Sequence, residues 1–90
     1  MEKRTYFLAV YKAAEGGYWG RLPDFHGVND QGETLEETVM NAKSLLNFAV
    51  KEMLDAGQPL PEPVEGEALL AKLDPENGTP DCVVPVTVAI

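Results

Sequence analysis

The sequence contains one cysteine and one histidine, and it has no long uninterrupted run of hydrophobic residues. The single Cys82 excludes an internal disulfide. Because His26 is the one histidine of the sequence, there is also no cysteine–histidine cluster to suggest a structural metal site. No stretch approaches the roughly 18 apolar residues that a membrane-spanning helix needs. The first residues lead directly into a strand-like run, without the pattern of a secretion signal. We therefore expect a cytoplasmic protein without a membrane segment, a bound metal or a cofactor.

Basic residues are also scarce. There are 7 lysines and arginines against 15 acidic residues, and the formal net charge is −8. Residues 58–81 hold most of the excess, with six acidic side chains and one lysine, whereas residues 82–90 carry no charge. A surface of this sign repels phosphate backbones, so we expect no direct binding to nucleic acid. Such a surface would suit a basic protein partner. On composition alone the simpler explanation is that the negative charge only keeps a small protein soluble.

Ninety residues with 44% hydrophobic content are enough for one small domain spanning 1–90. Residues 5–12 alternate so that both faces of a predicted strand are apolar. The two faces consist of Tyr6, Leu8 and Val10, and of Phe7, Ala9 and Tyr11. Both faces must then be covered, one by a helix and the other by something else. A second copy of the chain is one candidate, because domains this small often gain stability by oligomerising, and we expect a homodimer or tetramer.

The residues after this strand predict a series of short elements. Residues 13–17 end in two glycines and predict a hairpin connection. Residues 18–22 then form the returning strand, 23–27 a bend, and 28–31 a short third strand. The three predicted strands are antiparallel neighbours.

Thr34 opens the one long helix of the sequence. Its hydroxyl can accept the amide of Glu37 while the Glu37 side chain reaches back, which is the capping box. Gly57 is placed to end the helix in a left-handed cap, and Pro59 prevents a restart. Between these signals, apolar residues recur at spacings of three and four and form one stripe. The predicted stripe consists of Leu35, Val39, Ala42, Leu45, Leu46, Ala49, Met53 and Leu54.

Residues 58–81 form a proline-rich, acidic connection. Three prolines make residues 58–63 extended, and residues 67–73 predict one or two helical turns held by leucines. Residues 82–90 form the last strand, in which Pro85 favours the edge of a sheet. The predicted order is strand, strand, strand, helix, strand. It defines an α+β fold with three antiparallel strands, one crossover helix and a final strand.

No group of residues predicts a catalytic centre. His26 follows Asp24 by two positions, but a histidine beside glycine in a bend is more often an exposed loop residue. Four carboxylates fall within 13 residues, and two-metal nucleases do gather acids around divalent ions. They are Asp24, Asp30, Glu33 and Glu36. Acids at the start of a helix also suit the helix dipole, and we favour that interpretation, so we expect no enzyme.

Several short motifs follow one another in a fixed order. They are Gly17-Tyr18, Leu22-Pro23-Asp24 with Gly27, Gly32-x-Thr34-x-Glu36-Glu37, Asn41-Ala42, and Gly57-x-Pro59-x-Pro61. Each motif alone is weak, but as an ordered set they make the chain similar to the HicB family of antitoxins. The resemblance covers residues 5–63 well and the closing strand loosely.

The resemblance implies a partial RNase H-like fold that lacks working nuclease residues. It also implies binding to a small basic toxin of the HicA type, an mRNA-cleaving ribonuclease whose active site the antitoxin covers. Two departures stand out. His26 and Val28 occur where the family often has proline and cysteine, and many members continue into a DNA-binding domain, which we do not expect within residues 1–90.

Three functions are compatible with these patterns. The first is the antitoxin of a type II toxin–antitoxin system, which masks a basic toxin through the acidic connection and the aromatic hairpin. The residues expected to bind the partner are Tyr18, Trp19, Glu62, Glu65 and Glu67. The second is an orphan homo-oligomeric domain of the same family, and the third is a metal-dependent nuclease that uses the four carboxylates named above.

Overall fold

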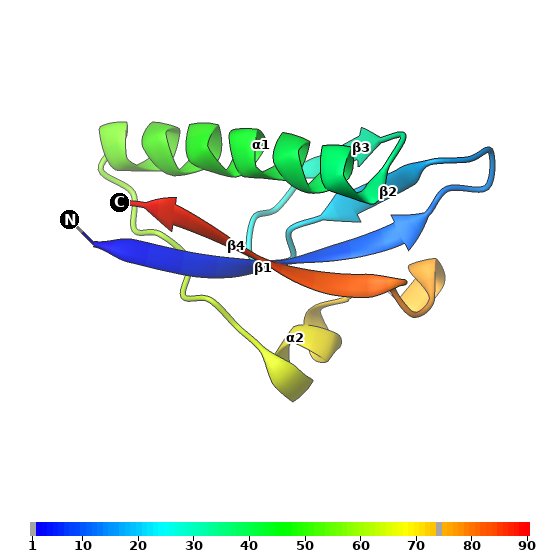
Figure 1. The fold of residues 1–90 in the computed structure, drawn as a ribbon. Helices are drawn as coiled ribbons and strands as arrows, with labels where there is room; N and C mark the ends of the chain where they lie inside the picture. Colours follow the sequence, from blue (N-terminus) through cyan, green and yellow to red (C-terminus); the bar gives the residue numbers. More distant parts are fainter. Residues whose placement is uncertain (1, 74) are drawn as a thin grey trace.

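The computed structural model describes residues 2–73 and 75–90. One antiparallel sheet has the strand order β3-β2-β1-β4, with the long helix α1 on one face and the short helix α2 on the other (Figure 1). The elements are β1 (Lys3–Lys12), β2 (Tyr18–Arg21), β3 (Asn29–Gly32), α1 (Leu35–Asp55), α2 (Gly66–Lys72), a 3₁₀ turn (Pro75–Asn77) and β4 (Cys82–Ala89). The predicted α+β class and the predicted order of elements are confirmed.

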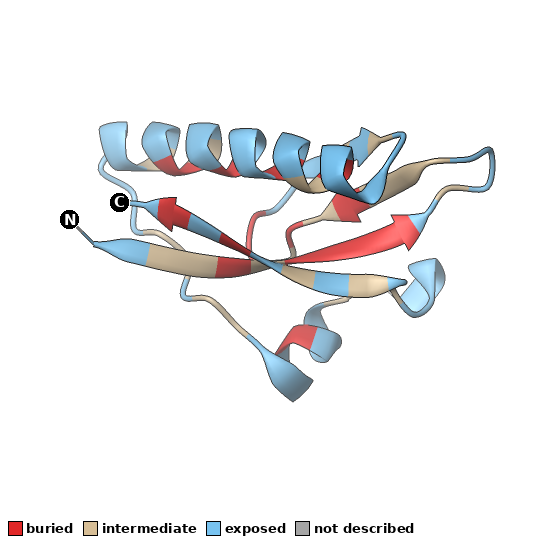
Figure 2. Ribbon diagram, viewed as in Figure 1, coloured by how far each residue is buried: buried red, intermediate tan, exposed pale blue. Residues whose placement is uncertain are grey.

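Both faces of β1 are largely covered, as its alternating apolar pattern predicts, although Phe7 on the second face is only partly buried. Tyr6, Leu8 and Val10 are fully buried and belong to the core that α1 covers. On the other face, Ala9 is fully buried and Tyr11 is only 5% exposed. Figure 2 shows this buried part of β1 in red, between the two helical layers. A single chain therefore covers both faces of its central strand.

Two parts of the chain cover the second face. Leu69 of α2 is buried, and it shares a hollow with Phe7 and Val83 of the sheet. Trp19 of β2 stacks on Tyr11, with ring centroids 4.3 Å apart and ring planes 12° from parallel. A second copy of the chain is thus not needed to bury Tyr11. The homodimer or tetramer stays a prediction.

Helix α1 begins and ends as the sequence predicts. The Thr34 hydroxyl accepts the Glu37 amide at 3.0 Å, and the Glu37 carboxylate accepts the amide of Glu33 at 3.3 Å. The reciprocal bond of the capping box therefore reaches one residue further back than the usual form. At the other end Gly57 takes a φ of +71°, and the three amides that follow the helix bond back to carbonyls of its last turn.

The buried stripe of α1 is narrower than predicted. Its four fully buried positions are spaced by four residues, at Thr38, Ala42, Leu46 and Val50. Thr38 and Val50 were not in the predicted stripe, and Thr38 can be buried because its hydroxyl donates to the Thr34 carbonyl at 2.9 Å. A helix lying on a sheet encloses only the side chains along its centre line, so leucines at the flanks and ends stay partly exposed. The prediction was wrong for Leu35, Leu45 and Leu54, which are 38%, 39% and 49% exposed.

Strand β4 pairs along its whole length with β1 and leaves its other edge open. The amide of Ile90 bonds to the carbonyl of Glu2 at 2.9 Å. Because bonded pairs alternate along an antiparallel ladder, the even-numbered residues of β4 point their amides at β1. The nitrogen of Pro85 therefore faces the open edge, where no bond of the sheet is lost. The predicted edge position of this strand is confirmed.

Gly32 and Gly57 test two different requirements for glycine. A Cβ added at Gly32 would lie 2.7 Å from the backbone nitrogen of Thr38, whereas nothing lies within 4 Å at Gly57 and only its positive φ opposes a side chain. We expect Gly32→Ala to lower the free energy of unfolding by about 3 kcal/mol, because β3 and α1 would be forced apart. Gly57→Ala should lower it by about 1 kcal/mol. Urea unfolding measures both, and equal losses would contradict this account.

Candidate protein-binding surface

Tyr18 and Trp19 lie on opposite faces of the sheet, as expected of neighbours in a strand. Tyr18 packs against the core beneath α1. Trp19 stacks on Tyr11 on the α2 face, by which we mean the sheet face opposite α1. There it lies beside Asn77 and Thr79 of the loop that follows α2. Of the two aromatic residues, only Trp19 shares a face with the acidic connection.

The three glutamates expected to bind a partner are all exposed, but their surroundings differ. Glu65 and Glu67 stand at the start of α2, and no lysine or arginine in the described part of the chain forms an ion pair with either. The pKa of Arg4 is raised, first by a hydrogen bond with Tyr6 and further by the nearby carboxylate of Glu62. None of the three glutamates forms an ion pair with a lysine or arginine in the described residues, and Glu62 differs only in lying near enough to Arg4 to contribute to that shift.

Asp24 fastens the acidic connection to the rest of the molecule. Its side chain is only 1% exposed, and its Oδ1 accepts the Lys72 ammonium at 2.8 Å. Its Oδ2 accepts the backbone amide of Val64 at 3.3 Å. Nearby, the Tyr6 hydroxyl donates to the carbonyl of Pro61 at 2.7 Å. The carboxylate of the Leu-Pro-Asp motif is thus a structural anchor for α2.

The four carboxylates considered for metal binding do not converge. Asp24 is occupied by the contacts just described. Asp30 lies on the α1 face, in the space that the missing side chain of Gly20 leaves, while Glu33 and Glu36 are exposed at the start of α1. Within residues 2–73 and 75–90, no three Asp, Glu, His or Cys side chains are placed to hold a metal ion. The geometry therefore gives the nuclease hypothesis no support.

Asp30 has an unusual environment for a carboxylate. Both of its side-chain oxygens are buried, and neither has a hydrogen-bond partner in the described residues. Burial raises the pKa of this carboxyl from 3.8 to about 6. Loss of its proton near neutral pH therefore places an unpaired charge inside the fold.

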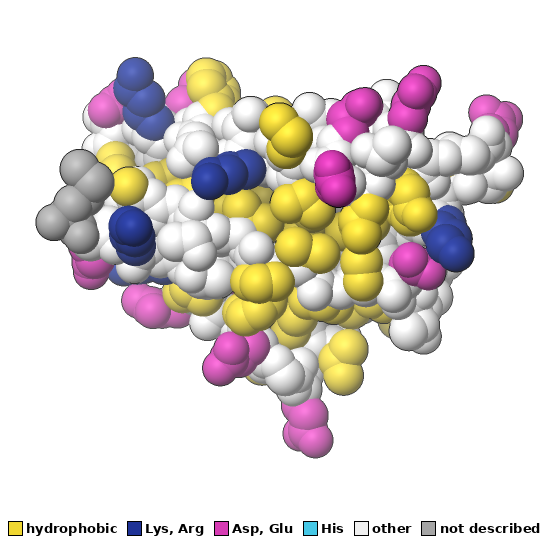
Figure 3. Space-filling model, in the orientation of Figure 1, with side chains coloured by type: hydrophobic (Ala, Val, Ile, Leu, Met, Phe, Trp, Pro, Cys, Tyr) yellow, Lys and Arg dark blue, Asp and Glu magenta, His cyan; other side chains and the backbone are white. Residues whose placement is uncertain are grey.

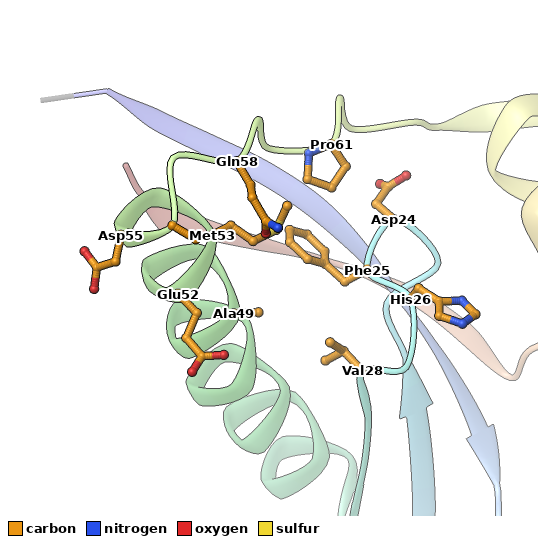
Figure 4. A pocket seen from close by; sticks show the side chains of 11 residues that line it. Asp24, Phe25, His26, Val28, Ala49, Glu52, Met53, Asp55, Gln58 and Pro61 are labelled. Atoms are coloured by element: carbon orange, nitrogen blue, oxygen red, sulfur yellow. The ribbon is translucent and has the colours of Figure 1, made fainter.

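A groove of about 780 Å³ lies between the last turns of α1 and the bend that follows β2. Phe25 and Met53 point into it, and Glu52 and Asp55 line its helical side (Figure 4). His26 lies on the opposite side, with its ring directed away from the groove. The two acids on the helical side of the groove, Glu52 and Asp55, are therefore not placed to orient this histidine as a general base. The groove has an apolar floor and an acidic rim.

Fold and surface together define a class of protein. It is a small α+β domain whose exposed features are acidic side chains around apolar hollows, without a converging set of catalytic groups in its described residues. None of the helices that the structure describes is both long and apolar enough to cross a membrane. Such a domain offers surfaces for contact with a partner.

Residues 6–89 match the family described as HicB_like antitoxin of bacterial toxin-antitoxin system, and the chain belongs to that family. A relative from Synechocystis sp., the UPF0150 protein ssl0738, is 39% identical over 64 residues. The matched stretch makes up 69% of this chain and 89% of that protein. The resemblance drawn from the ordered motifs is therefore confirmed.

Two solved structures share the fold. The N-terminal domain of the Burkholderia pseudomallei antitoxin HicB aligns with a TM-score of 0.75 at 24% identity, over 96% of this chain and 99% of that chain. A chain in a toxin–antitoxin complex from Streptococcus pneumoniae aligns with a TM-score of 0.79 at 22% identity, over 98% of this chain and 70% of that chain. At these identities the likeness establishes the fold.

Sequence reasoning missed two residues that shape the α2 face. Lys72 lies 48 positions from Asp24, and only the folded chain brings them together. Leu70 is 59% exposed beside Leu69, which is 5% exposed. The adjacent leucines did carry a signal, because neighbours on a helix point about 100° apart and a short helix packed on one side cannot bury both.

The anchor of α2 can be tested by replacing its cation. Lys72→Met removes the partner of a buried carboxylate, and we expect a loss of about 1–2 kcal/mol in the free energy of unfolding, because Lys72 itself is half exposed. Amides of residues 64–73 should exchange with solvent faster, while those of α1 should not change. Lys43→Met, on the exposed surface of α1, is the matched control. Unchanged exchange in residues 64–73 would contradict the anchoring role of Asp24.

The buried carboxyl of Asp30 predicts a pH dependence with a defined sign. Because its folded pKa of about 6 lies above its usual 3.8, the folded state binds the proton more tightly, and the free energy of unfolding falls as pH rises across this range. Asp30→Asn removes the titrating carboxyl and with it this pH dependence of the free energy of unfolding. We expect the stability of Asp30→Asn relative to the unchanged protein to rise by about 2 kcal/mol between about pH 4 and about pH 7. Chemical unfolding at both pH values measures it, and a constant difference would refute the prediction.

Proposed function

We propose that this chain is the antitoxin of a type II toxin–antitoxin system and that it binds and masks a small, basic, HicA-type toxin that cleaves mRNA. Membership of the HicB-like antitoxin family over residues 6–89 carries the proposal. A fold shared with a chain of a toxin–antitoxin complex is consistent with it. The net charge of −8 suits a cationic partner.

The inhibition we propose is steric and electrostatic. A toxin that cleaves RNA must hold a polyanion, so its active surface is positively charged. An acidic domain seated on that surface would exclude the substrate by occupying the same charges. The chain needs no catalytic group for this role. On this proposal it is a binding protein and not an enzyme.

The α2 face is the surface we favour for this contact. Trp19, Glu65 and Glu67 lie on it, as described above, and neither of these glutamates forms an ion pair in the described part of the chain. Tyr18 packs against the core instead, and Glu62 lies near Arg4 without forming an ion pair with it. Homo-oligomerisation stays compatible with this role, since a second copy could join through another surface.

Co-expression tests the proposed function. The product of the small open reading frame next to this gene should arrest growth when expressed alone, and this chain should restore growth and co-purify with it. In vitro, added chain should stop the partner's cleavage of RNA at about equimolar amounts, because masking is stoichiometric. Absence of both a complex and growth rescue would refute the antitoxin role. RNA cleavage by this chain alone would refute the non-enzymatic mechanism.

A further inference from the structure

An open apolar hollow of about 540 Å³ lies on the α2 face, between α2 and the β1–β4 pair. Leu69 is buried in it, while Leu70 is 59% and Val83 38% exposed. Figure 3 shows hydrophobic side chains gathered where β4 approaches α2, with acidic side chains at the tip of the molecule below them. The hollow is lined by Phe7, Glu65, Gly66, Leu69, Leu70 and Val83. One short helix and one strand edge thus present apolar side chains that the chain itself leaves open.

We propose that this hollow receives an apolar side chain of the toxin, and that Glu65 and Glu67 pair with a lysine or arginine next to that side chain. This docking site rests on the proposed function, because it takes the toxin as the partner. It assigns the contact to residues that the sequence patterns did not single out, above all Leu70 and Val83.

The charge around the hollow determines the kind of partner. Glu65 lines the hollow and Glu67 follows it in the first turn of α2, and neither has an ion-pair partner in the described residues. Lys72 is the one basic residue of the connection, and its ammonium is held by Asp24. An apolar centre with a charged rim is the usual arrangement of a protein interface. The rim here selects a cationic protein.

A second copy of the chain is a poor occupant of the same hollow. In a twofold-symmetric pair the same patch meets itself, so the Glu65 and Glu67 side chains of the two copies would be brought together. Each copy also carries a net charge of −8. Like charges that face each other across an interface cost several kcal/mol. A basic toxin would instead be attracted both by the two glutamates and by the net negative charge of the chain.

The hollow is already formed before binding. Leu69 packs into the sheet side of α2, and the connection is tied to Asp24 through Lys72 and Val64. Binding then does not have to order α2, and the apolar contact can contribute most of its free energy to affinity. The same anchor that holds the fold together therefore prepares the docking site.

A pair of matched apolar substitutions tests the hollow. Leu70→Asp should weaken the affinity for the purified product of the neighbouring open reading frame by about thirtyfold or more, as for a buried interface anchor. Met40→Asp is the control, because Met40 is 70% exposed on the outer surface of α1, away from the hollow; it should change the affinity by less than about threefold. Titration calorimetry measures both. Leu70→Ser provides the same test with a smaller change if Leu70→Asp does not fold.

A pair of charge reversals tests the rim. Glu65→Lys/Glu67→Lys should weaken binding by about tenfold and make it less sensitive to salt. Glu52→Lys/Asp55→Lys, which changes the charge equally on α1, should leave the salt dependence nearly as in the unchanged chain. Toxin binding that is insensitive to Leu70→Asp, Leu70→Ser and the rim reversal would overturn this docking site and leave the proposed function intact. Failure of the unchanged chain to bind the toxin would overturn the proposed function, and the docking site with it.

Discussion

The arrangement of this protein depends on one buried carboxylate. Asp24 is almost fully enclosed, and it holds Lys72 and the amide of Val64 against the bend that follows β2. A buried charge is stable only when it is paired and hydrogen-bonded, and the connection supplies both kinds of partner. The fold in turn gains a second layer, because α2 is drawn onto the sheet face opposite α1. The Leu-Pro-Asp motif of this antitoxin family is, in this chain, a fastening between two distant segments.

The two faces of the sheet differ in how completely they are buried. The α1 face carries the core, with Leu8, Val10 and Leu46 fully enclosed, and it accounts for most of the stability. The α2 face is covered by one short helix and one stacked tryptophan, which leaves apolar and acidic side chains in contact with solvent. A small domain can expose such a face because its core lies on the other side. If the α2 face binds the toxin as proposed, binding and folding place few conflicting demands on the same residues.

The parts of the fold that depend on local sequence could be predicted, and those that depend on distant contacts could not. The Thr34 cap, the Gly57 terminus and the edge position of Pro85 each follow from backbone chemistry within a few residues. The stripe of α1 was predicted too broadly, because its width depends on the shape of the sheet beneath it. The pairing of Asp24 with Lys72 and the burial of Asp30 require the folded chain, since neither has a local signal. For the same reason, the sequence could identify Glu65 and Glu67 as candidate binding residues, but it could not identify the residues that surround them in the folded chain.

The open edge of β4 has a consequence for how copies of this protein behave when crowded. Its last nine residues are uncharged, and a bare strand of that kind is a natural template for fibre-like stacking. Pro85 interrupts that template at its middle, because its nitrogen points outward and has no hydrogen to offer an incoming strand. Pro85 thus makes this edge a poorer partner for an added strand, and it removes no hydrogen bond from the sheet itself.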